Sequence, residues 1–166
     1  MGEQLTEDDI RKIKKEISDR KGPIRAKILE ELKAAKAQGD LSENFEYYSA
    51  KRANGRNNSR IRYLERLIKY GKVVEEAEDD GRAGINSKVT CLFMDRDKEA
   101  SYRIVTTVRQ NPLIGLISVQ SPVARALMGH REGDIVHVDL GDGRGYDLKI
   151  LSIEKEDDSQ DEINPY

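Results

Sequence analysis

The feature that most constrains the fold is a coiled-coil spacing of side chains between residues 42 and 74. The members of this seam lie 3, 4, 4, 3 and 4 residues apart: Ala50, Ala53, Asn57, Ile61, Leu64 and Ile68. This alternation is typical of a two-stranded antiparallel coiled coil. A helical pattern also precedes it: Ile24, Ile28, Leu32 and Ala35, with Gly39 placed to end the helix. We therefore expect a helical hairpin with arms of roughly 30 residues, each about 45 Å long.

Individual residues predict where the first helix starts and where the helical pattern of each arm is weakened. Thr6 stands before a run of acids and is the expected N-cap of the first helix. Gly22 and Pro23 interrupt the helical pattern, because proline lacks a backbone donor and disfavours helix in the residue before it. The stretch 54–58 is poor in helix formers, so we expect loose packing in the middle of the second arm.

The pattern changes after a polar linker that contains glycine. Runs rich in β-branched residues and bounded by turns predict strands. Ser121, Pro122 and Gly129 mark the start and end of one short helix. This half predicts a small antiparallel sheet with one helix, so the fold class of the chain is α+β with two domains. The expected strands are 88–93, 101–108, 115–119, 135–140 and 146–153. The expected parts are a hairpin (1–76), a linker (77–84), a sheet domain (85–156) and an acidic tail (157–166), with fraying expected from Glu154 onward.

Charge is unevenly distributed along the chain. The net charge of −2 is the sum of +4 in residues 1–76 and −6 in the remainder. Between the two helical patterns, Gly39–Tyr47 carries three carboxylates and no Lys or Arg, whereas residues 48–72 carry eight basic residues and one acid. This layout suggests a device that carries carboxylates to a distant site while its basic flank holds a polyanion.

Several function classes are excluded by composition. One cysteine, Cys91, rules out an intramolecular disulfide framework, and no Cys/His cluster has metal-ligand spacing. No apolar run approaches the roughly 20 residues that span a bilayer, and Met1–Ile10 is too acidic and polar for a signal peptide. A cytoplasmic protein without membrane contact is expected. Cys91 is expected in the core, and His137 on the exposed face of a strand.

Two stretches resemble the Gre transcript-cleavage factors of bacterial RNA polymerase, of GreA/GreB type. Gly39–Tyr47 reads GDLSENFEY, close to GDLSENAEY in that family. Ile117–Gly129 reads ISVQSPVARALMG and is followed by Glu132-Gly133-Asp134, similar to the family's second motif, and Tyr102–Val105 matches a family strand. The likeness covers nearly the whole chain in the right order.

The resemblance implies a coiled-coil hairpin and a C-terminal domain of FKBP-like fold. In such a factor the C-terminal domain docks at the rim of the polymerase secondary channel, and the hairpin passes down it. The tip acids, here Asp40 and Glu43, then help to hold a second Mg²⁺ in the polymerase active site, where backtracked RNA is cut. This implies an accessory factor rather than an enzyme, with RNA polymerase and the nascent RNA 3′ end as partners. No cofactor is expected on the free protein, which is expected to be a monomer.

The resemblance also suggests roles for further residues. Phe45 departs from the family, which usually has a small residue there, and the basic second arm looks closer to GreB than to GreA, so the choice between these types stays open. The expected roles are tip support by Ser42, Asn44, Glu46 and Tyr47, RNA binding by Lys51, Arg52, Arg56 and Arg60, and polymerase docking by Ser121, Pro122, Arg125 and Leu127.

Other interpretations remain open at this point. Asp40 and Glu43 also fit an N-cap and capping box at a helix start, and the basic run also fits a solvated helix face. A relative that occupies the channel without promoting cleavage is the main functional alternative. A prolyl isomerase is rejected, because it needs a deep aromatic pocket and the second half has few aromatic residues.

Overall fold

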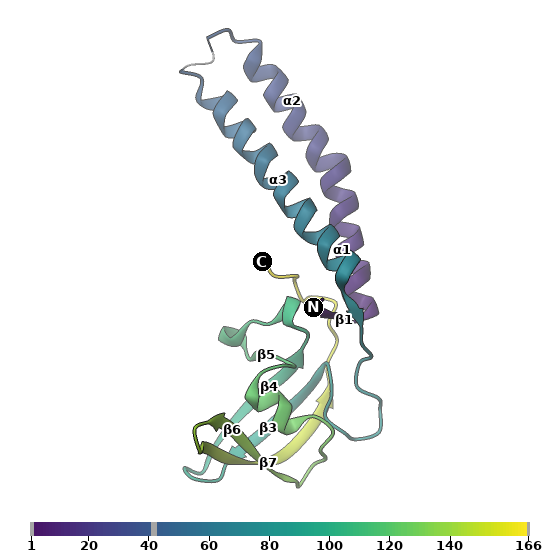
Figure 1. Cartoon of the computed structure of the whole chain (residues 1–166), viewed down its shortest axis with the longest axis vertical. Helices are drawn as coiled ribbons and strands as arrows, with labels where there is room; N and C mark the ends of the chain where they lie inside the picture. Colours follow the sequence, from purple (N-terminus) through teal and green to yellow (C-terminus); the bar gives the residue numbers. More distant parts are fainter. Residues whose placement is uncertain (1, 41–42, 166) are drawn as a thin grey trace. The chain divides into compact units, whose positions relative to one another are not determined.

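A computed structural model describes residues 2–40 and 43–165 (Figure 1). It divides into two compact units, one consisting chiefly of residues 9–71 and the other of residues 3–8 and 72–164. Among the described residues, none of the helices combines the length and the apolar character that crossing a bilayer requires. The predicted α+β class is confirmed, with the helical hairpin in the first half and the sheet in the second.

The first unit is a helical hairpin. Its first arm consists of α1 (Glu7–Asp19), a kinked π-helical turn (Arg20–Ile24) and α2 (Arg25–Lys36), and its second arm is α3 (Phe45–Tyr70). Figure 1 shows α2 and α3 side by side. The predicted interruption appears as the kink, since Gly22 has non-helical angles (φ −98°, ψ −105°) next to Pro23. The helix therefore bends at these residues and does not end there.

The predicted seam is the buried side of α3. Ala50, Asn57, Ile61 and Leu64 are buried, and Leu67 is more fully buried than the expected Ile68. Ile28 and Ala35 are the buried residues of α2. Each fully buried Leu or Ile side chain contributes about 1.5–3 kcal/mol, so a seam this short leaves the hairpin dependent on other contacts.

Polar contacts at the kink also join the two arms of the hairpin. Asn57 is 3% exposed, and its Nδ2 donates to the carbonyl of Arg20 (3.0 Å) while its Oδ1 accepts from Arg20 (3.1 Å). Arg25 donates to Asn58 Oδ1 at 3.1 Å. The expectation of loose packing at 54–58 is wrong, because α3 is continuous there and two of its asparagines are bonded to the opposite arm.

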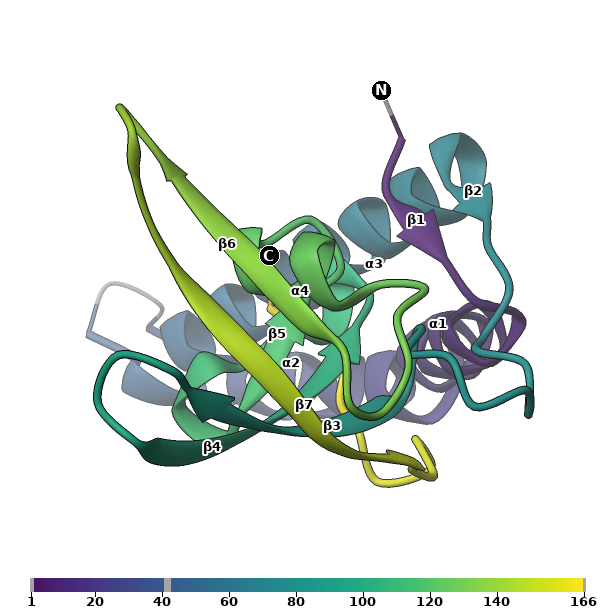
Figure 2. The same cartoon turned by 90° about the horizontal axis from the view of Figure 1, so that it is seen from below.

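The second unit is a curled sheet with one short helix. Its strand order is β5-β4-β3-β7-β6, and Figure 2 shows the strands curving past α4. The elements are β3 (Ser87–Phe93), β4 (Lys98–Val105), β5 (Leu116–Ser118), α4 (Pro122–Leu127), β6 (Ile135–Gly141) and β7 (Arg144–Lys155). All five predicted strands and the predicted helix are present.

Two features of strand pairing were not predicted. β5 pairs with β4 in parallel, because two 3₁₀ turns between them (107–109 and 112–114) carry the chain back before it re-enters the sheet. The expectation of a purely antiparallel sheet is therefore wrong at this pair. In addition, β1 (Gln4–Leu5) pairs in parallel with β2 (Lys72–Val73), which are far apart in the sequence.

The core of this unit lies between the sheet and α4. Cys91 is in it, as predicted, and burial raises the pKa of its thiol to about 11. His137 is exposed, also as predicted. The fully packed members are Ala83, Val89, Cys91, Ile104, Ala124, Leu127, Val136, Val138, Leu148 and Ile150.

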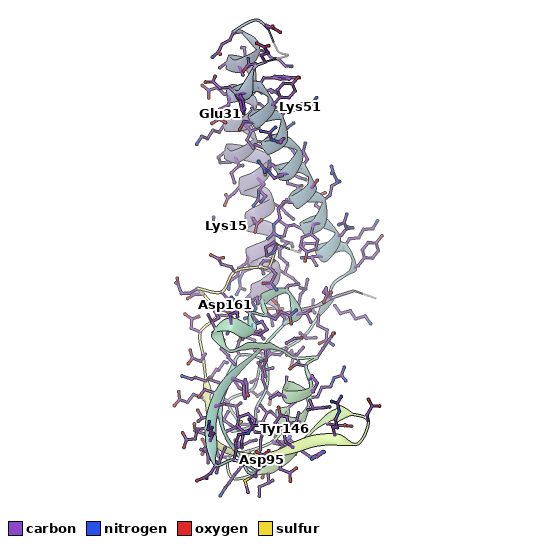
Figure 3. The ribbon with its side chains drawn as sticks, turned by 90° about the vertical axis from the view of Figure 1, so that its left-hand side faces the viewer. Lys15, Glu31, Lys51, Asp95, Tyr146 and Asp161 are labelled. Carbon is purple, nitrogen blue, oxygen red and sulfur yellow. The ribbon has the colours of Figure 1, made fainter. Side chains whose placement is uncertain are left out.

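The acidic tail is bound to this unit. Arg109 is 1% exposed and donates to Asp161 Oδ2 (2.7 Å) and to Asn86 Oδ1 (2.9 Å). Arg103 also pairs with Asp161, which Figure 3 labels. Further on, the backbone N–H of Asn164 donates to Val108 at 2.7 Å. The expectation of a tail frayed from Glu154 onward is wrong up to residue 164, because β7 extends to Lys155 and the buried arginines need a carboxylate partner, which the tail supplies.

Candidate functional site

The connection between α2 and α3 forms the tip of the hairpin. After α2, the N–H groups of Gln38 and Gly39 bond back to Ala35 (3.2 Å) and Lys36 (3.3 Å). Gly39 then has φ +102°, a region that favours glycine. Asp40 and Glu43 follow this turn, and both are exposed. The predicted support residue Ser42 lies outside the described residues.

Asn44 fixes the start of α3. Its Oδ1 accepts from the N–H of Tyr47 (3.0 Å), which makes it the N-cap, and its Nδ2 donates to the carbonyl of Ala35 (2.8 Å). The second bond ties the start of α3 to the last turn of α2. The alternative in which Asp40 caps this helix and Glu43 completes a capping box is wrong, because α3 begins four residues beyond the position that it requires.

Two other predicted support residues also contact the tip. Glu46 accepts a hydrogen bond from Gln38 Nε2 at 3.0 Å, which is a second bridge between the arms. The Tyr47 ring packs edge-on against Tyr48, with centroids 5.2 Å apart, and Lys51 Nζ lies 6.0 Å from the Tyr47 centroid. The bond between Gln38 and Glu46 thus joins the two sides of the tip, whereas the aromatic contacts lie within α3.

The tip can offer a metal ion only part of its coordination. Carboxylate oxygens suit Mg²⁺, which usually keeps several waters and takes one or two carboxylates. In the described ranges, the one group of three acidic side chains with convergent oxygens is Asp8, Glu76 and Asp158 of the second unit, all within 4.8 Å. Asp158 there also accepts a hydrogen bond from Asn86 (3.3 Å). Asp40 and Glu43 by themselves therefore supply fewer ligands than a tightly held Mg²⁺ takes.

The basic side chains of α3 divide into two groups. Lys51, Arg52 and Arg56 are exposed, and Figure 3 shows Lys51 near the tip end of the hairpin. Arg60 has a side chain only 12% exposed, and it donates to Glu16 through Nε (2.7 Å) and through its terminal nitrogen (3.1 Å). The structure thus contradicts the expected role of Arg60 in RNA binding, because its guanidinium is engaged in joining the arms.

The carboxylate of Glu16 accepts hydrogen bonds from two arginines, one on each arm of the hairpin. Arg20 donates to the same carboxylate oxygen as Arg60, at 2.7 Å. Burial by itself would raise the pKa of Glu16, but the hydrogen bonds from Arg60 and Arg20 outweigh it, so the pKa lies below its ordinary value. Glu16 is therefore a charged structural group of the hairpin, and no sequence pattern pointed to it.

The residues expected to dock on polymerase surround α4. Ser121 caps this helix by accepting from the N–H of Ala124 (3.2 Å), while Pro122 and Arg125 are exposed. Leu127 is 0% exposed and belongs to the core. Its expected role as a docking contact is wrong, because a side chain buried between helix and sheet cannot reach a partner.

Comparison with known proteins places the chain in a family. A family described as "Transcription elongation factor, N-terminal" matches residues 3–73, and one described as "Transcription elongation factor, GreA/GreB, C-term" matches residues 78–155. Transcription elongation factor GreA of Acholeplasma laidlawii is 32% identical over 150 residues, which is 90% of this chain and 95% of that protein. GreA of Nitrosococcus oceani is 36% identical over 141 residues, covering 84% and 89%.

A solved structure, the GreA factor homolog 1 of Thermus thermophilus, matches with a TM-score of 0.43 and 22% identity, covering 93% of this chain and 99% of that one. The two family matches together span nearly the whole sequence, and the relatives named above align over most of their own length. The chain belongs to the GreA/GreB family of transcription elongation factors.

Proposed function

We propose that this chain binds RNA polymerase through its secondary channel and stimulates endonucleolytic cleavage of backtracked nascent RNA. The observation that carries the proposal is the pair of exposed carboxylates, Asp40 and Glu43, on a tip whose ends are joined through Asn44. Membership in the GreA/GreB family supports it. In this proposal the chain is an accessory factor, and the nuclease site is that of the polymerase.

Asp40 and Glu43 would hold a Mg²⁺ that is shared with the polymerase active site. When bound, such an ion activates water for attack on a phosphodiester and stabilises the developing charge. The contribution of this chain is positional: the bond from Asn44 to Ala35 and the bridge from Gln38 to Glu46 restrict the tip. Two carboxylates are too few ligands for tight binding alone, so activity is expected only in the complex.

The exposed basic residues near the tip would contact RNA phosphates. Lys51, Arg52 and Arg56 fall within about two and a half turns of helix beyond Tyr47, and all three are exposed. Contacts of this kind are electrostatic and independent of sequence, and they weaken as salt rises. Arg60 is left out of this set because it pairs with Glu16.

Docking on the polymerase would use the exposed start of α4. Pro122 and Arg125 face solvent, and Ser121 fixes the helix start. An arginine beside a rigid helix start suits a carboxylate on a protein partner. In this proposal the hairpin positions the metal ligands and the sheet unit attaches the chain to the polymerase.

The test uses halted, backtracked elongation complexes with 3′-labelled RNA over a Mg²⁺ titration. Wild-type protein should release short 3′ fragments, and the Asp40→Asn/Glu43→Gln double variant should bind polymerase equally well but release none. Glu30→Gln is the matched control, since it removes an exposed acid from α2 without touching the tip. If wild-type protein binds and releases nothing, a channel-binding regulator without cleavage activity becomes the better conclusion.

A further inference from the structure

Phe45 is the most exposed aromatic residue of the hairpin. It is the first residue of α3, directly after the N-cap Asn44, and it is 86% exposed. The aromatic ring is not needed to fix the start of α3, because Asn44 both caps the helix and bonds to Ala35. A large apolar ring left in water next to the two tip acids is therefore a candidate contact for another molecule.

The helical repeat puts Phe45 at the end of a basic face of α3. With 3.6 residues per turn, Phe45, Tyr48, Arg52 and Arg56 fall within about 100° of arc. All four are exposed, Tyr48 to 41%. The two acids of α3, Glu46 and Glu65, fall outside this arc. Between Phe45 and Arg56, this face of the helix thus carries two aromatic rings and two guanidinium groups without a carboxylate.

On its other side, Phe45 lies next to acidic residues. There the ring borders a hollow of about 460 Å³ between the arms, and the rest of the lining is Glu31, Ala34, Glu46, Ser49 and Ala50. Figure 3 shows Glu31 at this end of the hairpin. A polyanion is disfavoured in that hollow by its two acids. The favoured course for phosphates is therefore along the outer face, over Arg52 and Arg56.

We propose that Phe45 stacks on an unpaired nucleobase of the extruded RNA while Arg52 and Arg56 hold the adjoining phosphates. Proteins bind single strands with aromatic faces for the bases and a positive track for the backbone. The span from Phe45 to Arg56 is about 16 Å along the helix axis, enough for a short single-stranded segment. This inference rests on the proposed function, because it takes backtracked RNA as the strand.

The first experiment compares Phe45→Ala, Phe45→Leu and Phe45→Trp in full-length protein. On backtracked complexes, the concentration for half-maximal cleavage should rise about tenfold for the Ala and Leu variants and stay near wild type for Trp. Affinity for RNA-free polymerase should be unchanged in all three. Tyr70→Ala is the matched control, since Tyr70 is an exposed aromatic (59%) at the far end of the same helix.

The second experiment replaces the extruded nucleotides by abasic ones. Wild-type protein should lose its advantage over Phe45→Ala on this RNA, because no base remains to stack. Three results would overturn stacking: equal performance of Leu and Trp, a Phe45→Ala defect that persists on abasic RNA, or weaker binding to RNA-free polymerase, which would place Phe45 against protein. If wild-type protein releases RNA fragments and the Phe45 variants do so equally well, only the stacking proposal is wrong. If wild-type protein releases no fragments, the proposed function is wrong as well.

Discussion

The hairpin and the sheet unit are stabilised in different ways. The sheet unit has a contiguous core of ten buried residues, all of them apolar or cysteine, between its strands and α4. The hairpin has a narrow seam interrupted by the buried Asn57, and its arms are also joined by the side chains of Glu16, Arg20 and Arg60. The sheet unit therefore relies chiefly on burial, whereas the hairpin adds to its narrow seam polar pairs that a single substitution or a pH change can remove.

The largest effect is expected in the core of the sheet unit. Leu127→Ala should destabilise it by about 3 kcal/mol, through lost burial and the cavity that remains. Urea unfolding of the full chain, with amide exchange to assign the loss to β3–β7, measures this. Arg125→Ala on the same helix is the control and should change stability by less than about 0.5 kcal/mol. Equal stability of the two variants would mean that Leu127 is not a core residue.

The next effect concerns the tip and is functional. Asp40→Asn/Glu43→Gln should reduce cleavage about a hundredfold or more, since several kcal/mol of charge stabilisation depend on metal ligands. Unfolding of the hairpin should stay within about 0.5 kcal/mol of wild type, because both side chains are exposed. A variant that loses cleavage together with hairpin stability would break the separation between function at the tip and stability along the arms.

The polar junction at the kink is expected to matter less. Asn57→Ala should destabilise the hairpin by about 1–3 kcal/mol, because the carbonyl of Arg20 loses its donor in a buried place. Hydrogen exchange should show faster exchange in α3 and no change in the sheet. Asn54→Ala, in the same helix, is the control and should have the smaller effect. If both variants behave alike, the stretch is loosely packed after all.

The smallest effect is a pH dependence from Glu16. Its pKa is lower in the folded hairpin than its ordinary value, so its contribution is present above about pH 4.3 and is lost as pH falls through the folded pKa. Stability of the hairpin should therefore decline in acid more steeply in wild type than in Glu16→Gln. Parallel pH profiles of the two proteins would show that the ion pairs with Arg20 and Arg60 contribute nothing measurable.

Patterns that repeat along one segment were predictable. Four of the six residues predicted for the seam of α3 are buried (Ala50, Asn57, Ile61 and Leu64), and Ala53 and Ile68 are half-buried. Helical spacing brings such near neighbours in sequence onto one face. The cap at Ser121 and the kink at Gly22-Pro23 likewise follow from local backbone chemistry. At the candidate site, the sequence identified the exposed acids of the tip and the basic run beside them.

Contacts between remote segments were not predictable. Arg60 and Leu127 were assigned to partners outside the chain, yet one binds Glu16 and the other lies in the core. An arginine or a leucine can lie either at the surface or inside the protein. Arg60 is turned inward by Glu16, 44 residues away in the sequence, and Leu127 by the sheet that packs against it. The tail was assigned to solvent for the same reason, because Asp161 finds Arg109 52 residues back in the chain.

The α+β class, the hairpin with its acidic tip and the five strands could be read from local patterns, since each depends on periodicity, turn residues or charge within a short stretch. Which charged groups remain exposed and which pair inside the molecule became clear from the three-dimensional fold alone. It paired Glu16 with Arg60, placed Asn44 rather than Asp40 at the helix start, and left Phe45 in solvent. Burial and ion pairing depend on distances between residues that are far apart in the chain, and no local sequence pattern records these distances.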